Sequence, residues 1–196
     1  MVKVKICGLM DQFTVEAACD MGADFLGFVF AKSKRQVTPE AVAAMTINVP
    51  KRVKKVGVFV SPKIEEVKET IDIAKLDLVQ IHQVIPAGRL PVPLIAAQNG
   101  ETSDGTLPFG ADYLLLDAPS QDFAGGNGKT FDWQALDVST LPQKQLMVAG
   151  GLQVNNVASV IDHFQPIAVD VSSGVETNGI KDLEKIKAFI ERVKGR

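Results

Sequence analysis

The sequence predicts an α/β protein, a (β/α)8 TIM barrel of reduced size. Short apolar segments alternate with segments of helical period, the apolar segments number eight, and no linker or break in composition divides the chain. The 196 residues, 46% of them hydrophobic, suit a single domain over residues 1–196. Because this fold usually takes about 250 residues, we expect a shortened version. An open, doubly wound parallel sheet built from similar units is the alternative.

The expected strands and helices alternate along the chain. We expect strands at residues 2–6, 25–30, 55–60, 78–82, 93–97, 113–116, 145–149 and 167–171. We expect helices at residues 11–21, from Thr38 onward, and at 61–74, 132–136, 155–163 and 182–193. Thr38 followed by Pro39 is a typical helix start, because threonine caps a helix and proline suits its first turn.

The strand expected at 93–97 lies between two segments without helical character. Residues 83–92 and 99–109 contain several glycines and prolines and have no i, i+3, i+4 apolar spacing. We therefore predict that helices four and five are missing or very short, and that irregular loop covers the strand. Since the strand is apolar on both faces, an apolar patch would remain there, and it would suit a homodimer contact.

Composition and charge exclude several classes of protein. With 21 basic and 23 acidic residues, the chain lacks the positive charge that nucleic-acid binders concentrate. The longest apolar run, residues 25–31, is too short to span a bilayer. The first residues lack the apolar core and cleavage site of a signal peptide, and Cys7 and Cys19 give no disulfide framework. We expect a cytoplasmic protein that binds neither nucleic acid nor membrane.

Reactive side chains and small-residue turns fall where the expected strands end. Barrel enzymes carry their catalytic groups at the carboxyl ends of the strands, and these positions hold Cys7, His82, Asp117 and Asp170. After strands seven and eight come Gly150-Gly151 and Ser172-Ser173-Gly174. Small residues let backbone N–H groups approach an anion, so these turns predict a phosphate site, ordinary tight turns being the alternative. No zinc-ligand spacing is evident, and we expect neither metal nor cofactor.

Several collinear motifs resemble the phosphoribosylanthranilate isomerase family. They run from the first strand to the last helix: Lys5-Ile6-Cys7-Gly8-Leu9, Gly22-Ala23-Asp24, Gly27-Phe28-Val29-Phe30, Val56-Gly57-Val58-Phe59-Val60, Leu115-Leu116-Asp117, Gly125-Gly126-Asn127-Gly128, Phe131-Asp132-Trp133, Ala149-Gly150-Gly151-Leu152 and Val169-Asp170-Val171-Ser172-Ser173-Gly174-Val175-Glu176. The resemblance implies an Amadori rearrangement in tryptophan biosynthesis. N-(5-phosphoribosyl)anthranilate would become 1-(2-carboxyphenylamino)-1-deoxyribulose 5-phosphate, by one acid and one base without a cofactor.

The resemblance assigns the base to Cys7 and the acid to Asp117. A free thiol has a pKa of about 8.5, so Cys7 must lose its proton, and Lys5, two residues away on the same strand face, is placed to hold the thiolate. Asp117 must stay protonated, which burial or a nearby carboxylate would achieve. Without the surrounding motifs, Cys7 would be read as a small buried hydrophobe and Asp117 as an end-of-strand turn residue.

The resemblance also assigns residues that bind substrate. Arg35 matches the anchor of the anthranilate carboxylate, and His82 is expected to line the site. Asp170 is expected to contact the anilino nitrogen or the sugar hydroxyls, and a structural ion pair with Lys5 is the alternative. The partner is thus a small phosphosugar.

Two other functions compete with this interpretation. The related isomerase of histidine biosynthesis performs the same chemistry on a two-phosphate substrate, but it is expected to have carboxylates where this chain has Cys7. A non-catalytic phosphosugar-binding barrel would not need both Cys7 and Asp117. An enzyme that accepts both substrates stays open. The chain departs from the family at Gln83, where glycine is usual, and in the shorter segment 83–112.

Overall fold

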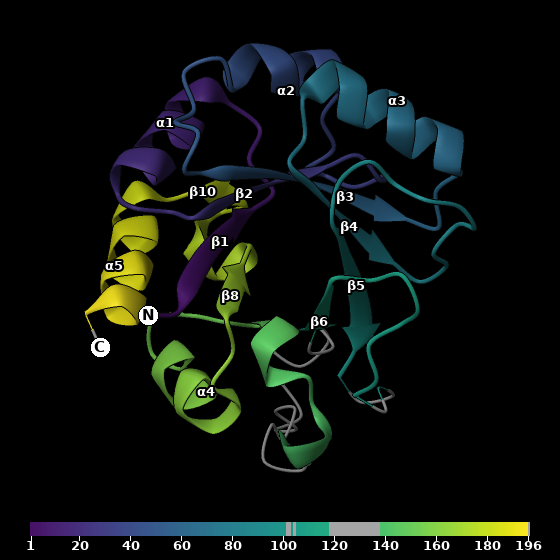
Figure 1. Cartoon of the computed structure of the whole chain (residues 1–196). Coiled ribbons are helices and arrows are strands. Elements are labelled where there is room, and N and C mark those ends of the chain that lie inside the picture. The colour runs from purple at the N-terminus through teal and green to yellow at the C-terminus, as the bar shows by residue number, and fades with distance from the viewer. Residues whose placement is uncertain (101–102, 104, 118–137, 196) are drawn as a thin grey trace.

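The computed structural model describes residues 1–100, 103, 105–117 and 138–195, and Figure 1 shows strands enclosed by helices on part of their circumference. The strands are β1 (Lys3–Cys7), β2 (Phe25–Val29), β3 (Lys54–Val60), β4 (Leu78–His82), β5 (Leu94–Asn99), β6 (Tyr113–Asp117), β7 (Leu146–Ala149) and β8 (Ala168–Val171). Each strand pairs in parallel with the next, and β8 pairs with β1. The sheet is therefore a closed barrel, as predicted, and the open doubly wound sheet is excluded.

The alternation of side chains along each strand divides the core into two parts. Val4 and Ile6 of β1 belong to the large outer core between the strands and the helices. A smaller cluster fills the barrel interior, and it includes Phe25, Leu115 and Met147. Because side chains alternate with period two, Lys5 and Cys7 face inward, on the opposite side from Val4 and Ile6. The polar groups of β1 therefore point toward the barrel axis.

Five α-helices lie in the described part of the chain. They are α1 (Gln12–Asp20), α2 (Pro39–Met45), α3 (Ile64–Ala74), α4 (Val157–Phe164) and α5 (Leu183–Lys194). The side chain of Asp11 caps α1 by accepting from the N–H of Thr14, and Thr38 caps α2 by accepting from the N–H of Ala41. These caps satisfy N–H groups that have no partner within the helix. None of the described helices has the length and apolar character needed to cross a membrane.

The wall around β5 has no helical cover in the described residues. Residues 83–93 contain no helix, and neither do the described residues between 100 and 112. This confirms the prediction that the helices after the fourth and fifth strands are missing or very short; the helices labelled α4 and α5 lie later in the chain. Three prolines interrupt the first segment, and Gly88 has a φ of +122°, which no helix accommodates. An open groove lined by residues 85–94, 108–110 and 112 lies there instead.

The strand and helix bounds differ from the expected ones mainly at the ends. β5 begins one residue later than expected and extends to Asn99, and α3 begins at Ile64 instead of near Ser61. The helix expected at 132–136 and the motifs between 125 and 133 lie outside the described residues.

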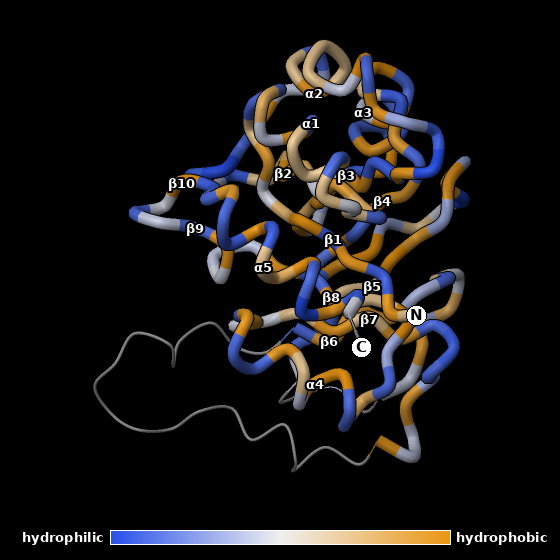
Figure 2. The backbone as a smooth tube through the Cα atoms, turned by 90° about the vertical axis from the view of Figure 1, so that its left-hand side faces the viewer, coloured by the Kyte–Doolittle hydropathy of each residue, from blue (hydrophilic) through white to orange (hydrophobic). Residues whose placement is uncertain are grey.

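A two-stranded hairpin, which the sequence analysis did not predict, follows β8. Its strands β9 (Glu176–Thr177) and β10 (Ile180–Lys181) are antiparallel. Asn178 and Gly179 join them with φ values of +53° and +80°, a conformation that these two residue types adopt most readily. Figure 2 shows the hairpin projecting beyond the barrel. It carries two charged residues, Glu176 and Lys181, to the rim of the site.

Candidate active site

One pocket at the carboxyl ends of the strands is lined by every residue to which the sequence analysis gave a catalytic, substrate-binding or phosphate-binding role. Its lining contains Cys7, Arg35, His82, Asp117, Gly150, Gly151, Asp170, Ser172, Ser173 and Gly174. Val58, Gln80, Ala149 and Leu152 complete the lining. Residues far apart in the sequence meet here because parallel strands of a barrel all end at the same face.

A buried ion pair crosses the floor of the pocket. Lys5 Nζ lies 2.8 Å from Asp170 Oδ2, and the two side chains are 0% and 6% exposed. The ion pair that the sequence analysis considered for Asp170 is therefore present. The other oxygen, Oδ1, is buried and has no hydrogen-bond partner among the described residues. One carboxylate oxygen of Asp170 thus binds the lysine and the other is left to accept a hydrogen bond.

Cys7 and Lys5 lie together over Gly27 of β2. A Cβ at Gly27 would lie 2.8 Å from Cys7 Sγ and 3.0 Å from Lys5 Nζ, so glycine makes the room that both side chains occupy. Burial raises the pKa of the Cys7 thiol above its ordinary value, and the charge of Lys5 offsets this only in part. Burial alone would lower the pKa of Lys5, but Asp170 and Cys7 raise it overall. Lys5 therefore stays charged beside a thiol that is protonated at rest.

Asp117 ends β6 with a strongly shifted carboxyl group. Burial raises its pKa, the negative charge of Asp170 raises it further, and Lys5 opposes the shift, giving a pKa of about 6. An ordinary exposed aspartate ionises near 3.9. Asp117 therefore carries a proton at a pH where most carboxyl groups have lost theirs, as a general acid requires.

His82 is held by a residue that the sequence analysis missed. The Nε2 atoms of Gln80 and His82 are 2.9 Å apart. This hydrogen bond holds the imidazole ring in one orientation. Burial lowers the pKa of His82, so the ring is neutral. Gln80 occupies the alternate position on β4, and the period-two spacing that relates Lys5 to Cys7 also relates Gln80 to His82.

The two turns predicted to bind phosphate are in direct contact. Gly150 and Gly151 have φ values of +88° and +58°. A Cβ at Gly174 would lie only 1.8 Å from the carbonyl oxygen of Leu152. The backbone carbonyl of Leu152, the residue after Gly150-Gly151, thus packs directly against the second turn. Ser173 begins a short 3-10 helix (Ser173–Val175), and the first N–H groups of such a turn have no intrahelical partner.

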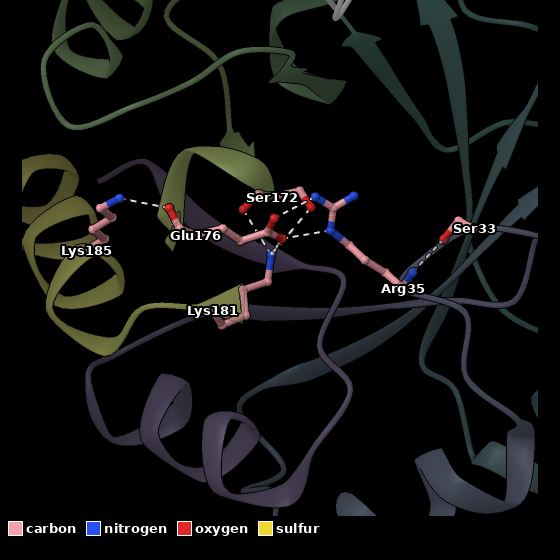
Figure 3. Close-up of polar contacts among 6 residues, drawn as sticks. All are labelled: Ser33, Arg35, Ser172, Glu176, Lys181 and Lys185. Carbon is pink, nitrogen blue, oxygen red and sulfur yellow. Dashed lines mark hydrogen bonds and ion pairs between the residues drawn. The ribbon is translucent and has the colours of Figure 1, made fainter. Parts of the chain in front are cut away.

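Arg35 reaches the pocket from the loop after β2. Its Cδ lies 2.4 Å from where a Cβ of Gly8 would be, so its side chain runs across the residue that follows Cys7. Nε and Nη2 each donate to Glu176, at 2.7 Å, as Figure 3 shows. The sequence analysis quoted Glu176 within a motif but gave it no role, and it missed Lys181, which also binds Glu176.

Comparison with known proteins identifies the family. The model of a family described as N-(5'-phosphoribosyl)anthranilate (PRA) isomerase matches residues 4–192, nearly the whole chain. The chain belongs to the N-(5'-phosphoribosyl)anthranilate isomerase family. The isomerase of Streptococcus mutans is 54% identical over 197 residues, covering 99% of this chain and 100% of the relative. That of Listeria monocytogenes serotype 4b is 50% identical over 200 residues and covers 98% of each.

Solved structures of the isomerase family share the whole fold. A TrpF structure from Jonesia denitrificans is 32% identical with a TM-score of 0.85, covering 100% of this chain and 98% of the other. The isomerase of Thermotoga maritima is 34% identical with a TM-score of 0.80, covering 100% of both chains. A phosphoribosyl anthranilate isomerase solved with reduced 1-(o-carboxyphenylamino)-1-deoxyribulose 5-phosphate is 32% identical, with a TM-score of 0.78 and full coverage of both chains.

Proposed function

We propose that Cys7 and Asp117 divide the two proton transfers by which this chain converts N-(5-phosphoribosyl)anthranilate to 1-(2-carboxyphenylamino)-1-deoxyribulose 5-phosphate. Asp117 protonates the furanose ring oxygen, and the ring opens to a Schiff base. Cys7, as the thiolate, removes the proton from C2. The resulting enolamine tautomerises to the ketone. The reaction is a step of tryptophan biosynthesis and needs one acid and one base.

The observation that carries the proposal is that Asp117 and Cys7 line one pocket and that both have raised pKa values. The pKa of Asp117 is raised to about 6, and that of Cys7 lies above its ordinary value. At neutral pH the resting pair is therefore a carboxylate and a thiol. The reactive pair is a protonated Asp117 and a Cys7 thiolate. It holds as many protons in total as the resting pair, but it is the less populated of the two states. Lys5 supports it, because the lysine charge stabilises the thiolate.

The binding roles follow from the same pocket. Asp170 Oδ1 accepts from the anilino nitrogen or the sugar hydroxyls, His82 lines the site, and Arg35 binds the carboxylate of the anthranilate ring. Gly150-Gly151 and Ser172-Ser173-Gly174 bind the phosphate through backbone N–H groups. One crystal structure of the Thermotoga maritima isomerase describes a dimeric enzyme. A homodimer through the uncovered wall at β5, and a cytoplasmic location, stay predictions for this chain.

The pH dependence of kcat/KM tests the acid and the base together. We expect kcat/KM to rise with pH through about 6, the pKa of Asp117, and then to level off. Below that pH Asp117 is already protonated, so raising the pH only adds thiolate. Above it, the loss of the Asp117 proton cancels the gain in thiolate until Cys7 itself ionises. A profile that falls through pH 6 from an acidic maximum would contradict the assignment.

A variant separates this titration from that of the substrate phosphate, which also ionises near pH 6. Asp170→Asn removes a charge that raises the pKa of Asp117 and leaves Lys5 unopposed, so the acidic limb moves to lower pH. A limb caused by the substrate phosphate would stay where it is.

Inorganic phosphate tests the anion site. We expect it to inhibit competitively with respect to substrate, because it occupies the turns after β7 and β8. Chloride at equal ionic strength serves as the control for screening of charge. If crystals soaked in phosphate or sulfate showed the anion only elsewhere on the barrel, the site would be wrong.

A further inference from the structure

A buried network of three charged side chains borders the pocket where the hairpin meets the loop after β2. Arg35 donates twice to Glu176, and Lys181 Nζ lies 2.7 Å from Glu176 Oε1. The Glu176 and Lys181 side chains are each 5% exposed and that of Arg35 is 19% exposed. Figure 3 shows Glu176 between the two cations. A carboxylate so enclosed contributes to the geometry of its partners far more than an exposed ion pair does.

The contact with Glu176 fixes which edge of the Arg35 guanidinium is available. A guanidinium has five N–H donors in a planar fork, and the bidentate contact uses the edge formed by Nε and Nη2. Neither N–H of Nη1 has a partner among the described residues. The side chain cannot turn about its long axis without breaking both bonds. Arg35 thus presents one defined edge and lies across Gly8, next to Cys7.

Lys181 and the hairpin hold Glu176 in place. Burial raises the pKa of Glu176, but the hydrogen bonds and charges of Arg35 and Lys181 outweigh it and give a pKa of about 2. Lys181 also donates to the carbonyl oxygen of Ser172 at 2.9 Å. Lys185 donates to the carbonyl oxygen of Glu176 at 2.8 Å. The network therefore joins Arg35 to the turn at Ser172.

We propose that Glu176 is a positioning residue that presents Arg35 to the substrate carboxylate, with Lys181 as its support. The inference rests on the proposed function, in which Arg35 binds that carboxylate. Glu176 itself touches no reacting atom. Its effect is on recognition of the carboxylate, so it changes KM and leaves the proton transfers at Cys7 and Asp117 intact.

The test compares two substrates, N-(5-phosphoribosyl)anthranilate and its analogue without the carboxylate, N-(5-phosphoribosyl)aniline. Glu176→Gln keeps the shape of the side chain but loses its charge. We expect it to raise KM for the first substrate about tenfold, the low end of what a charge-assisted hydrogen bond contributes, and to leave kcat and the KM for the analogue nearly unchanged. Arg35→Ala should also raise KM chiefly for the first substrate. The double variant Arg35→Ala with Glu176→Gln should have the same KM for that substrate as Arg35→Ala alone.

Lys181→Met is the second variant. Because Lys181 also donates to the carbonyl oxygen of Ser172 in the phosphate turn, the variant should raise KM for both substrates, and more for N-(5-phosphoribosyl)anthranilate. Glu65→Gln, on the exposed first turn of α3, is the matched control and should change neither constant. Equal increases in KM for both substrates, or additive effects of Arg35→Ala and Glu176→Gln, would show a merely structural role and overturn the inference. A native chain that does not turn over N-(5-phosphoribosyl)anthranilate would instead overturn the proposed function.

Discussion

Cys7→Ser is expected to lose turnover by a factor of about 10²–10⁴, the usual contribution of a positioned proton-transfer group. Serine is nearly the same size as cysteine, so Gly27 and Lys5 keep their neighbours. Its hydroxyl, however, does not ionise to a useful extent beside Lys5, whereas a thiol does. Asp117→Asn should lose activity by a similar factor, because an amide cannot donate the proton that opens the ring. Single-turnover and steady-state kcat measure both effects.

The controls separate chemistry from stability. Cys19→Ser, at a buried position of α1, introduces the same change away from the pocket and should retain kcat even if it lowers the melting temperature. Both catalytic variants should still bind inorganic phosphate as the native enzyme does. A Cys7→Ser enzyme with kcat close to that of the native enzyme would exclude Cys7 as the base.

Gly174→Ala is expected to damage the site through crowding of the backbone. The added Cβ would lie 1.8 Å from the carbonyl oxygen of Leu152, so the two turns must separate. Overpacking of this kind usually costs about 1–3 kcal/mol of stability. A displacement of about 1 Å in a binding group can lower kcat/KM by about 10²-fold. Thermal unfolding and kcat/KM measured on the same preparation report the two effects.

Gly110→Ala is the contrasting control. No atom lies within 4 Å of its Cβ position, but its φ is +83°. Alanine there is strained by the left-handed backbone, at about 1 kcal/mol, and should leave kcat/KM unchanged. If Gly174→Ala retained native kcat/KM and native stability, the close packing of the turns would have no functional role.

The spacing of apolar residues and the residues typical of helix starts and turns were enough to predict the barrel. The strands are short and apolar, and helix starts such as Thr38-Pro39 are local signals, so their positions follow from neighbouring residues. The absence of helices around β5 was also predictable, because proline and glycine act locally. The exact bounds of β5 were not, since Gln98 and Asn99 extend the strand by pairing with β6, and such pairing depends on residues distant in the sequence.

The site residues were predicted from their positions at strand ends and from the family resemblance. Lys5 was also named beside Cys7 and Asp170, whereas the partners of Arg35 and His82 were not predicted. The Arg35–Glu176 contact joins residues 141 positions apart, and no local pattern encodes it. Lys181 is an ordinary charged residue in sequence, and only the Asn178-Gly179 turn, which folds the hairpin back, places it beside Glu176. Gln80 was accessible to the same period-two argument that linked Lys5 with Cys7.

The Lys5–Asp170 ion pair also links closure of the barrel to formation of the site. The two residues are 165 positions apart and face each other across β1 and β8, the strands whose pairing closes the barrel. Without β8 the barrel cannot close, and Lys5 has no counter-ion with which it could be buried; leaving one partner of a buried pair alone typically costs about 3–5 kcal/mol. A chain truncated before Asp170 therefore lacks both the closed barrel and the charge pair beside Cys7.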